Sequence, residues 1–106
     1  MDLAEKDRLE VLEGLKTVYD MPEICRFLGI VIAMFYNDHD PPQFHAFYND
    51  YTVRVKIDDG KVLSGQVPVR ILKYLEEWRQ LHVAELSDTW QKVQKYQPPG
   101  KISPLV

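Results

Sequence analysis

The sequence Phe44-His45-Ala46-Phe47-Tyr48-Asn49-Asp50-Tyr51-Thr52-Val53-Arg54-Val55-Lys56 predicts the central hairpin of the fold. Asn49 and Asp50 tolerate the left-handed backbone conformations that a tight hairpin turn requires. If Tyr48 pairs with Tyr51, one face of the hairpin is apolar and carries Phe44, Ala46, Val53 and Val55 as well. The other face pairs Phe47 with Thr52, His45 with Arg54, and Gln43 with Lys56. Because one register sorts both strands, we predict a half-buried antiparallel pair.

The segments on either side of this hairpin predict one or two more strands and a helical C-terminal half. Residues 29–36 are apolar on both faces, which is typical of a strand covered on both sides. Residues 61–64 follow a turn and predict a short strand. Pro68 suits the first turn of a helix. An apolar stripe then predicts two helices or one bent helix. His82 and Glu85 could form a weak cap at the start of the second helix. The stripe consists of Ile71, Leu72, Leu75, Trp78, Leu81, Leu86, Trp90 and Val93. Glu76, Glu77, Arg79 and Gln80 are expected to point away from that stripe.

These elements predict an α+β fold in which a small antiparallel sheet of three to four strands packs against two C-terminal helices. Residues 2–19 predict an extra amphipathic helix in front, because leucines recur there at three- and four-residue steps. We therefore expect an N-terminal extension over residues 1–20, a single domain over residues 21–97, and an irregular tail over residues 98–106.

The composition narrows the class of protein. The chain has 106 residues and a formal net charge of -3, all of which resides in residues 1–20. An acidic balance argues against strong binding to a phosphate backbone. The single cysteine, Cys25, allows no internal disulfide. Without a signal-like or membrane-spanning apolar run, the sequence predicts a cytoplasmic protein with no membrane association.

The richest cluster of titratable side chains is the loop from Asp38 to Ala46, which contains His39, Asp40 and His45. Two imidazoles and a carboxylate suit acid–base chemistry near neutral pH, or a metal ion with open positions. The alternative is that Asp38 and His39 only stabilise a tight loop that Pro41 and Pro42 stiffen. Because the spacing offers no third strong ligand, we predict neither a metal nor a cofactor.

A polar stripe on the open face of the hairpin contains Gln43, His45, Arg54 and Lys56, with Phe47 exposed among them. A basic strand face with an aromatic ring resembles some RNA-binding sheets, whereas a solvated sheet face is the simpler interpretation. An exposed aromatic ring among polar neighbours favours a contact surface. The positive charge of Arg54 should lower the pKa of His45.

Two stretches of this sequence resemble a family of short bacterial proteins that is catalogued as a domain of unknown function. They are Met21-Pro22-Glu23-Ile24-Cys25-Arg26-Phe27 with Gly29-Ile30, and Asp38-His39-Asp40-Pro41-Pro42-Gln43-Phe44-His45-Ala46. The hallmark of the family is Asp-His-x-Pro-Pro-His-Phe-His-Ala, and the resemblance extends from Met21 to about Gln97. It implies a gene next to that of another small protein, and a place among toxin–antitoxin components or transcriptional regulators, with no established activity.

This sequence departs from the family pattern in two places. Gln43 stands where relatives have a histidine, so that any acid–base or metal-binding role of that histidine is lost here. Relatives commonly begin near Met21, which marks residues 1–20 as an addition.

Two functions remain open. The first is a protein-binding module in a toxin–antitoxin-like gene pair, which forms a homodimer or binds a small cognate protein. Its predicted binding residues are Asp38, Gln43, Phe47 and Lys56. The second is a small ribonuclease-like toxin, in which His39 and His45 supply acid–base catalysis while Arg54 and Lys56 stabilise phosphate charge.

Overall fold

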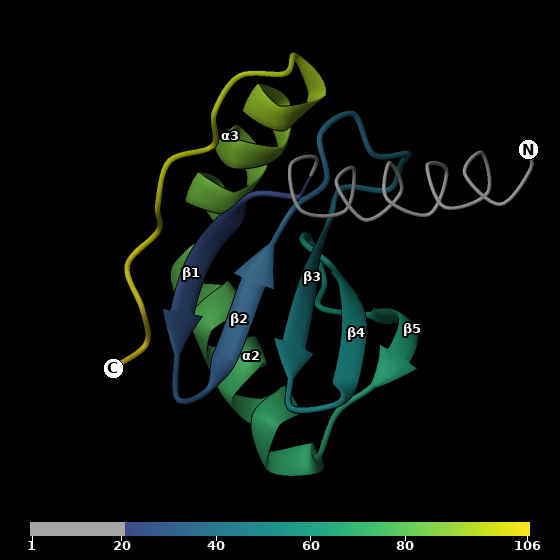
Figure 1. Cartoon of the computed structure of the whole chain (residues 1–106), viewed down its shortest axis with the longest axis vertical. Helices are drawn as coiled ribbons and strands as arrows, with labels where there is room; N and C mark the ends of the chain where they lie inside the picture. Colours follow the sequence, from purple (N-terminus) through teal and green to yellow (C-terminus); the bar gives the residue numbers. More distant parts are fainter. Residues whose placement is uncertain (1–20) are drawn as a thin grey trace, which may run out of the picture.

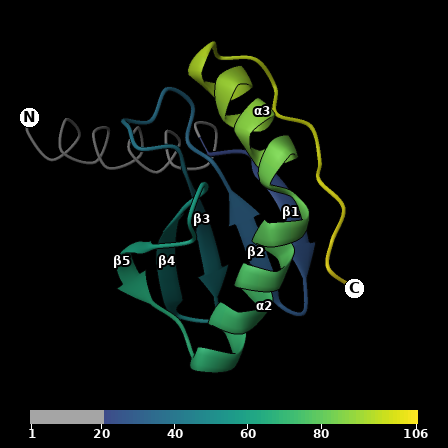
Figure 2. The same ribbon diagram turned by 180° about the vertical axis from the view of Figure 1, so that it is seen from behind.

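Each strand of the sheet pairs with the strand that follows it in the sequence. The computed structural model describes residues 21–106, in which β1 (Glu23–Phe27), β2 (Ile30–Ala33), β3 (Gln43–Tyr48), β4 (Tyr51–Lys56) and β5 (Val62–Gln66) form one antiparallel sheet (Figure 1). Two helices follow, α2 (Val69–Leu81) and α3 (Val83–Gln94), and both lie on the same side of the sheet (Figure 2). This arrangement confirms the α+β class. The helix predicted over residues 2–19 lies outside the described residues.

The register predicted for the central hairpin is confirmed at all six positions. Tyr48 pairs with Tyr51, and the pairs continue through His45 with Arg54 to Gln43 with Lys56. Phe44 faces the helices, since its ring lies edge-on to that of Trp78 at a centroid distance of 5.7 Å. His45 and Arg54 therefore belong to the opposite face, which we call the open face of the sheet because neither α2 nor α3 covers it.

The sheet has five strands, so the prediction of three to four was wrong. The missed strand is β1, which pairs with β2 through a two-residue turn at Leu28 and Gly29. Both turn residues have positive φ angles, 51° and 78°, as tight hairpin turns require. Leucine rarely adopts this conformation, so that the turn has no clear sequence signal and Gly29 looks like the start of a strand.

The two helices are separated by a single residue. His82 leaves the helical conformation at φ -127°, yet its carbonyl oxygen still accepts a hydrogen bond from the Leu86 N–H at 2.8 Å. Its Nδ1 lies 2.6 Å from Glu85 Oε1, in place of a bond to the backbone. The structure thus has the two predicted helices, with His82 as the single residue between them.

Arg79 corrects the expected polar face of α2, because its side chain is buried. Its Nη1 donates to the Ile57 carbonyl oxygen at 2.8 Å, and two further nitrogens bind the Glu76 carboxylate at 2.7 Å and 2.6 Å. The guanidinium group therefore connects the turn between β4 and β5 to α2 by hydrogen bonds. Hydrogen bonding to Arg79 also lowers the pKa of Glu76.

The hydrophobic core lies between the sheet and the helices, and Trp78 is the largest of its fully buried side chains. The C-terminal tail, residues 98–106, has no regular secondary structure but closes the outer edge of the sheet. Ile102 is buried, and its N–H donates to the Ile24 carbonyl oxygen of β1 at 2.8 Å. The Trp78 indole donates to the Ser103 carbonyl oxygen at 2.9 Å. In the part of the chain that the structure describes, no helix has the length and apolar character needed to cross a bilayer.

Candidate functional site

The loop between β2 and β3 lies at the end of the sheet next to α3 (Figure 1). Two hydrogen bonds connect it to the end of that helix. The Asn37 N–H donates to the Val93 carbonyl oxygen at 2.9 Å, and the Gln94 side-chain amide donates to the Asp38 carbonyl oxygen at 2.9 Å. The backbone of the loop is thus fixed by an element that lies more than fifty residues further along the chain.

Gln43 holds the loop from the other side, at the start of β3. Its side-chain nitrogen donates to the carbonyl oxygens of His39 and Pro41, each at 3.1 Å, and its oxygen accepts from Arg54 Nη1 at 2.8 Å. The residue is completely buried. Gln43 therefore acts inside the molecule, and its side chain is not available to a partner.

Asp38 lies between the two histidines of the motif. Its Oδ2 is 3.3 Å from His45 Nε2, and its Oδ1 is 3.0 Å from His39 Nδ1 and accepts the His39 backbone N–H at 2.9 Å. The structure thus brings together both predicted imidazoles around one carboxylate. They differ in access, since the His45 side chain is 9% exposed and that of His39 is 74% exposed.

His45 is buried on the open face, where the ring of Phe35 stands edge-on to the imidazole at a centroid distance of 4.8 Å. Burial lowers the pKa of His45 from its ordinary value and outweighs the opposite effect of Asp38. Arg54 lowers this pKa further, as the sequence indicates, but it is a smaller cause. Because a carboxylate only accepts hydrogen bonds, the tautomer of His45 that binds Asp38 is the one with its proton on Nε2.

Arg54 lies on the open face of β4, directly across from His45 on the central strand β3. Its Nε donates to Ser64 Oγ on β5 at 2.7 Å, and its Nη1 donates to Gln43. Lys56 Nζ lies 3.6 Å from Asp58 Oδ1 and 3.7 Å from Asp59 Oδ2, in loose surface ion pairs.

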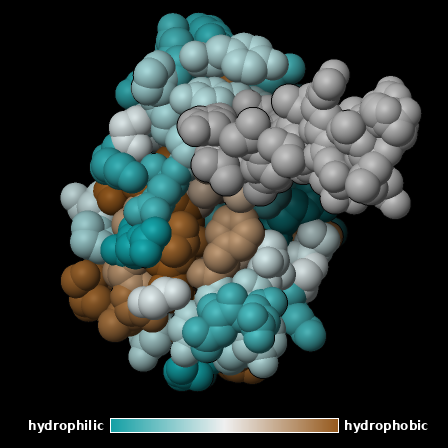
Figure 3. All heavy atoms as spheres, in the orientation of Figure 1, coloured by the Kyte–Doolittle hydropathy of each residue, from teal (hydrophilic) through white to brown (hydrophobic). Residues whose placement is uncertain are grey.

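Phe47 lies on the open face, where it was predicted, but it is half-buried and not exposed. It pairs across the sheet with Val31, which is also apolar and half-buried. Figure 3 views this side of the molecule and shows apolar surface on the β1–β2 side of the sheet, bordered by hydrophilic surface.

Two other possible kinds of site have little support. Across residues 21–106, no three histidine, cysteine or acidic side chains converge as metal ligands would. Burial raises the pKa of the Cys25 thiol, which makes it a poor nucleophile.

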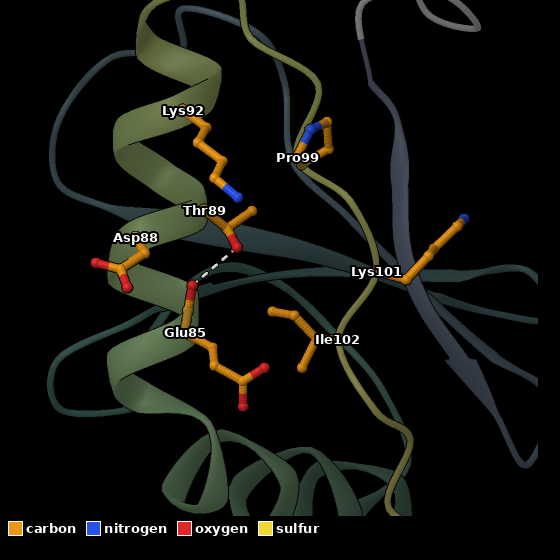
Figure 4. A pocket seen from close by; sticks show the side chains of 7 residues that line it. All are labelled: Glu85, Asp88, Thr89, Lys92, Pro99, Lys101 and Ile102. Atoms are coloured by element: carbon orange, nitrogen blue, oxygen red, sulfur yellow. Dashed lines mark hydrogen bonds between the residues drawn. The ribbon is translucent and has the colours of Figure 1, made fainter.

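A small hollow of about 150 Å³ lies between α3 and the tail (Figure 4). It is lined by Glu85, Asp88, Thr89, Lys92, Pro99, Lys101 and Ile102. Thr89 uses its hydroxyl on the Glu85 carbonyl oxygen at 2.8 Å, and the Lys101 ammonium turns away to the Glu23 carbonyl oxygen at 3.0 Å. Glu85, Thr89 and Lys101 already have hydrogen-bond partners within the chain, so this hollow is a weaker candidate than the loop and the open face.

Sequence reasoning missed three residues that shape the site, namely Phe35, Ser64 and Gln94. Ser64 could have been found, because extending the hairpin register to β5 places it opposite Arg54. Phe35 and Gln94 act through the path of the loop and the position of α3, which no local sequence pattern specifies.

The fold and site define a class of small α+β domains in which a five-stranded antiparallel meander carries a histidine-containing loop at one end and two helices on one face. The chain belongs to the family described as Domain of unknown function (DUF4160), whose model matches residues 29–91. The matched residues include the loop and the open-face residues of β3 and β4, whereas β1 and the tail lie outside them. No curated protein matches the chain, and no solved structure matches it either.

Proposed function

We infer that this chain is a protein-binding module that acts through the open face of its sheet and the Asp38–Ala46 loop. The observation that carries this proposal is the one-sided position of α2 and α3, which leaves the apolar pair of Val31 and Phe47 uncovered by either helix. Apolar side chains beside an arginine are typical of the centre of a protein interface.

The loop supports the same proposal. Its backbone is fixed by Gln43 from one side and by Gln94 from the other, so that it needs little ordering on binding. His39 is an exposed side chain of this loop and is suited to a polar contact at the rim of an interface.

The proposed setting is a toxin–antitoxin-like gene pair, in which the partner is a second copy of this chain or the small protein encoded by the neighbouring gene. This setting rests on the sequence resemblance. The compartment proposed for it is the cytoplasm.

The alternative is a ribonuclease-like toxin. His39 and His45 do lie around one carboxylate, which favours acid–base chemistry. However, this mechanism needs two imidazoles that both reach the phosphodiester, one as acid and one as base. Because His45 is buried, only His39 of the two is accessible.

The two functions can be separated by measuring growth arrest and binding with the same variants. Expressing the full chain should not arrest growth, and it should bind the product of the neighbouring gene or itself. We expect Phe47→Ala to weaken that binding by at least ~10-fold, as is common for an aromatic anchor. Tyr74→Ala, on the helix side, is the matched control. Growth arrest that His39→Ala abolishes, with binding intact, would instead establish the toxin.

A further inference from the structure

Among residues 21–106, Arg54 is the open-face arginine that uncharged side chains hold at two of its three guanidinium nitrogens. Ser64 Oγ accepts from Nε at 2.7 Å and Gln43 Oε1 accepts from Nη1 at 2.8 Å. Gln43 is itself completely buried and is fixed by two loop carbonyl groups. Within residues 21–106, Nη2 has no hydrogen-bond partner, and the side chain is not buried.

This arrangement is a preorganised donor. Ordering a free arginine on binding costs side-chain entropy, whereas a guanidinium group that two neighbours already hold has lost most of that freedom on folding. The other arginine on this face, Arg26, differs because its Nε and Nη2 both bind Glu23, at 3.3 Å and 2.7 Å. Arg26 therefore has its own carboxylate, and Arg54 lacks one among the described residues.

We propose that Arg54 is a carboxylate-binding site on the open face, and that the partner presents an aspartate or glutamate side chain to Nη2. This proposal rests on the protein-binding function and specifies the chemistry of the partner. Arg54 touches the ligand, and Ser64 and Gln43 are its positioning residues. Phe47, two residues along β3 from His45, supplies apolar surface beside the ion pair. Such surface excludes water and strengthens the interaction.

The site can be tested on the full chain without knowing the partner, by using acetate as the probe. A hydrogen-bonded Arg54 Nε–H should give a distinct signal in a proton–nitrogen NMR spectrum. Titration with sodium acetate, against sodium chloride at equal ionic strength, should shift this signal and leave that of Arg26 unchanged. Ser64→Ala removes one anchor at an exposed position, so the chain should fold normally and the acetate response should fall by several-fold.

Each other result would overturn the proposal. A wild-type chain that ignores acetate has no carboxylate site at Arg54. A larger response to inorganic phosphate than to acetate would indicate a nucleic-acid ligand. If the Ser64→Ala variant responds to acetate like the wild type, the guanidinium group of Arg54 is not preorganised. If acetate acts only after the six acidic residues of the N-terminal twenty are replaced by amides, the carboxylate comes from this chain. Because the titration uses the free protein, its failure is distinguishable from a failure to bind the neighbouring gene product.

Discussion

At the scale of single residues, His45 determines how the candidate site responds to pH. Burial lowers its pKa in the folded chain below the unfolded value of 6.5. Between those two pKa values the unfolded chain binds more protons, so that the free energy of unfolding rises with pH. The stabilisation is complete above about pH 6.5 and is lost as the pH falls toward the folded-state pKa.

We therefore expect the free energy of unfolding of the wild-type chain to fall more steeply from pH 7 to pH 5 than that of His45→Gln. Urea denaturation at several pH values measures the difference. His39→Gln is the matched control, because it keeps the buried imidazole and should follow the wild type. Equal slopes for wild type and His45→Gln would show that the imidazole is not buried as described.

The residues of the site were predictable in their position on the sheet, but not in their burial. The alternation of side chains places His45 and Arg54 on the open face in any correct register. Whether a side chain on that face is covered depends on the path of the loop, and the sequence does not specify that path. Gln43 illustrates the consequence, since its predicted contact with a partner is replaced by three hydrogen bonds inside the chain.

At the scale of elements, β5 depends on Gly65. This residue has a φ of 79°, and a Cβ atom placed on it would lie 2.1 Å from the backbone oxygen of Thr52 on β4. Gly100 has a similar φ of 75° but nothing within 4 Å of its Cβ position. Alanine variants at Gly65 and Gly100 therefore separate the effect of backbone strain from that of a steric clash.

We expect Gly100→Ala to lower the free energy of unfolding by about 1 kcal/mol, which is the strain of a left-handed residue with a side chain. Gly65→Ala should cost several times more, because β5 must move away from β4 as well. Thermal unfolding of both variants tests this expectation. Equal costs would mean that β5 is not paired at this position.

The anchor between α2 and the β4–β5 turn gives a second prediction at this scale. Arg79→Met keeps the apolar part of the side chain but leaves the buried Ile57 carbonyl oxygen without this donor. We expect a loss of about 2–3 kcal/mol of unfolding free energy in urea denaturation. Gln80→Met, at an exposed neighbouring position, should change it by less than about 0.5 kcal/mol. A similar small change in Arg79→Met would contradict the anchoring role.

Elements with regular patterns were the predictable ones. The central hairpin was predicted at every pair, and the two helices followed from their apolar stripe. The β1–β2 turn was missed because Leu28 adopts an unusual backbone conformation at 51°. Arg79 was misplaced because helical periodicity distinguishes faces, but does not reveal that a distant turn supplies acceptors for a buried guanidinium group.

At the scale of the whole molecule, the tail completes the fold even though it lacks secondary structure. Ile102 belongs to the core cluster and extends the backbone hydrogen bonding of β1. We expect Ile102→Ala to cost about 2–4 kcal/mol, as is typical of a buried isoleucine. Val106→Ala, at a position that is 77% exposed, should cost less than about 0.5 kcal/mol in the same denaturation experiment. Similar costs for the two variants would show that the tail does not pack on the core.

The central functional claim is that the open face and its loop bind a protein partner. The most direct test is a hydroxyl-radical footprint of the full chain, alone and mixed with the partner proposed above, the product of the neighbouring gene. We expect oxidation of Phe47 and His39 to fall in the complex, while oxidation of Leu81 and Tyr74 on the helix side stays unchanged. Protection of the helix side in place of Phe47 and His39, or no protection at all, would contradict the account.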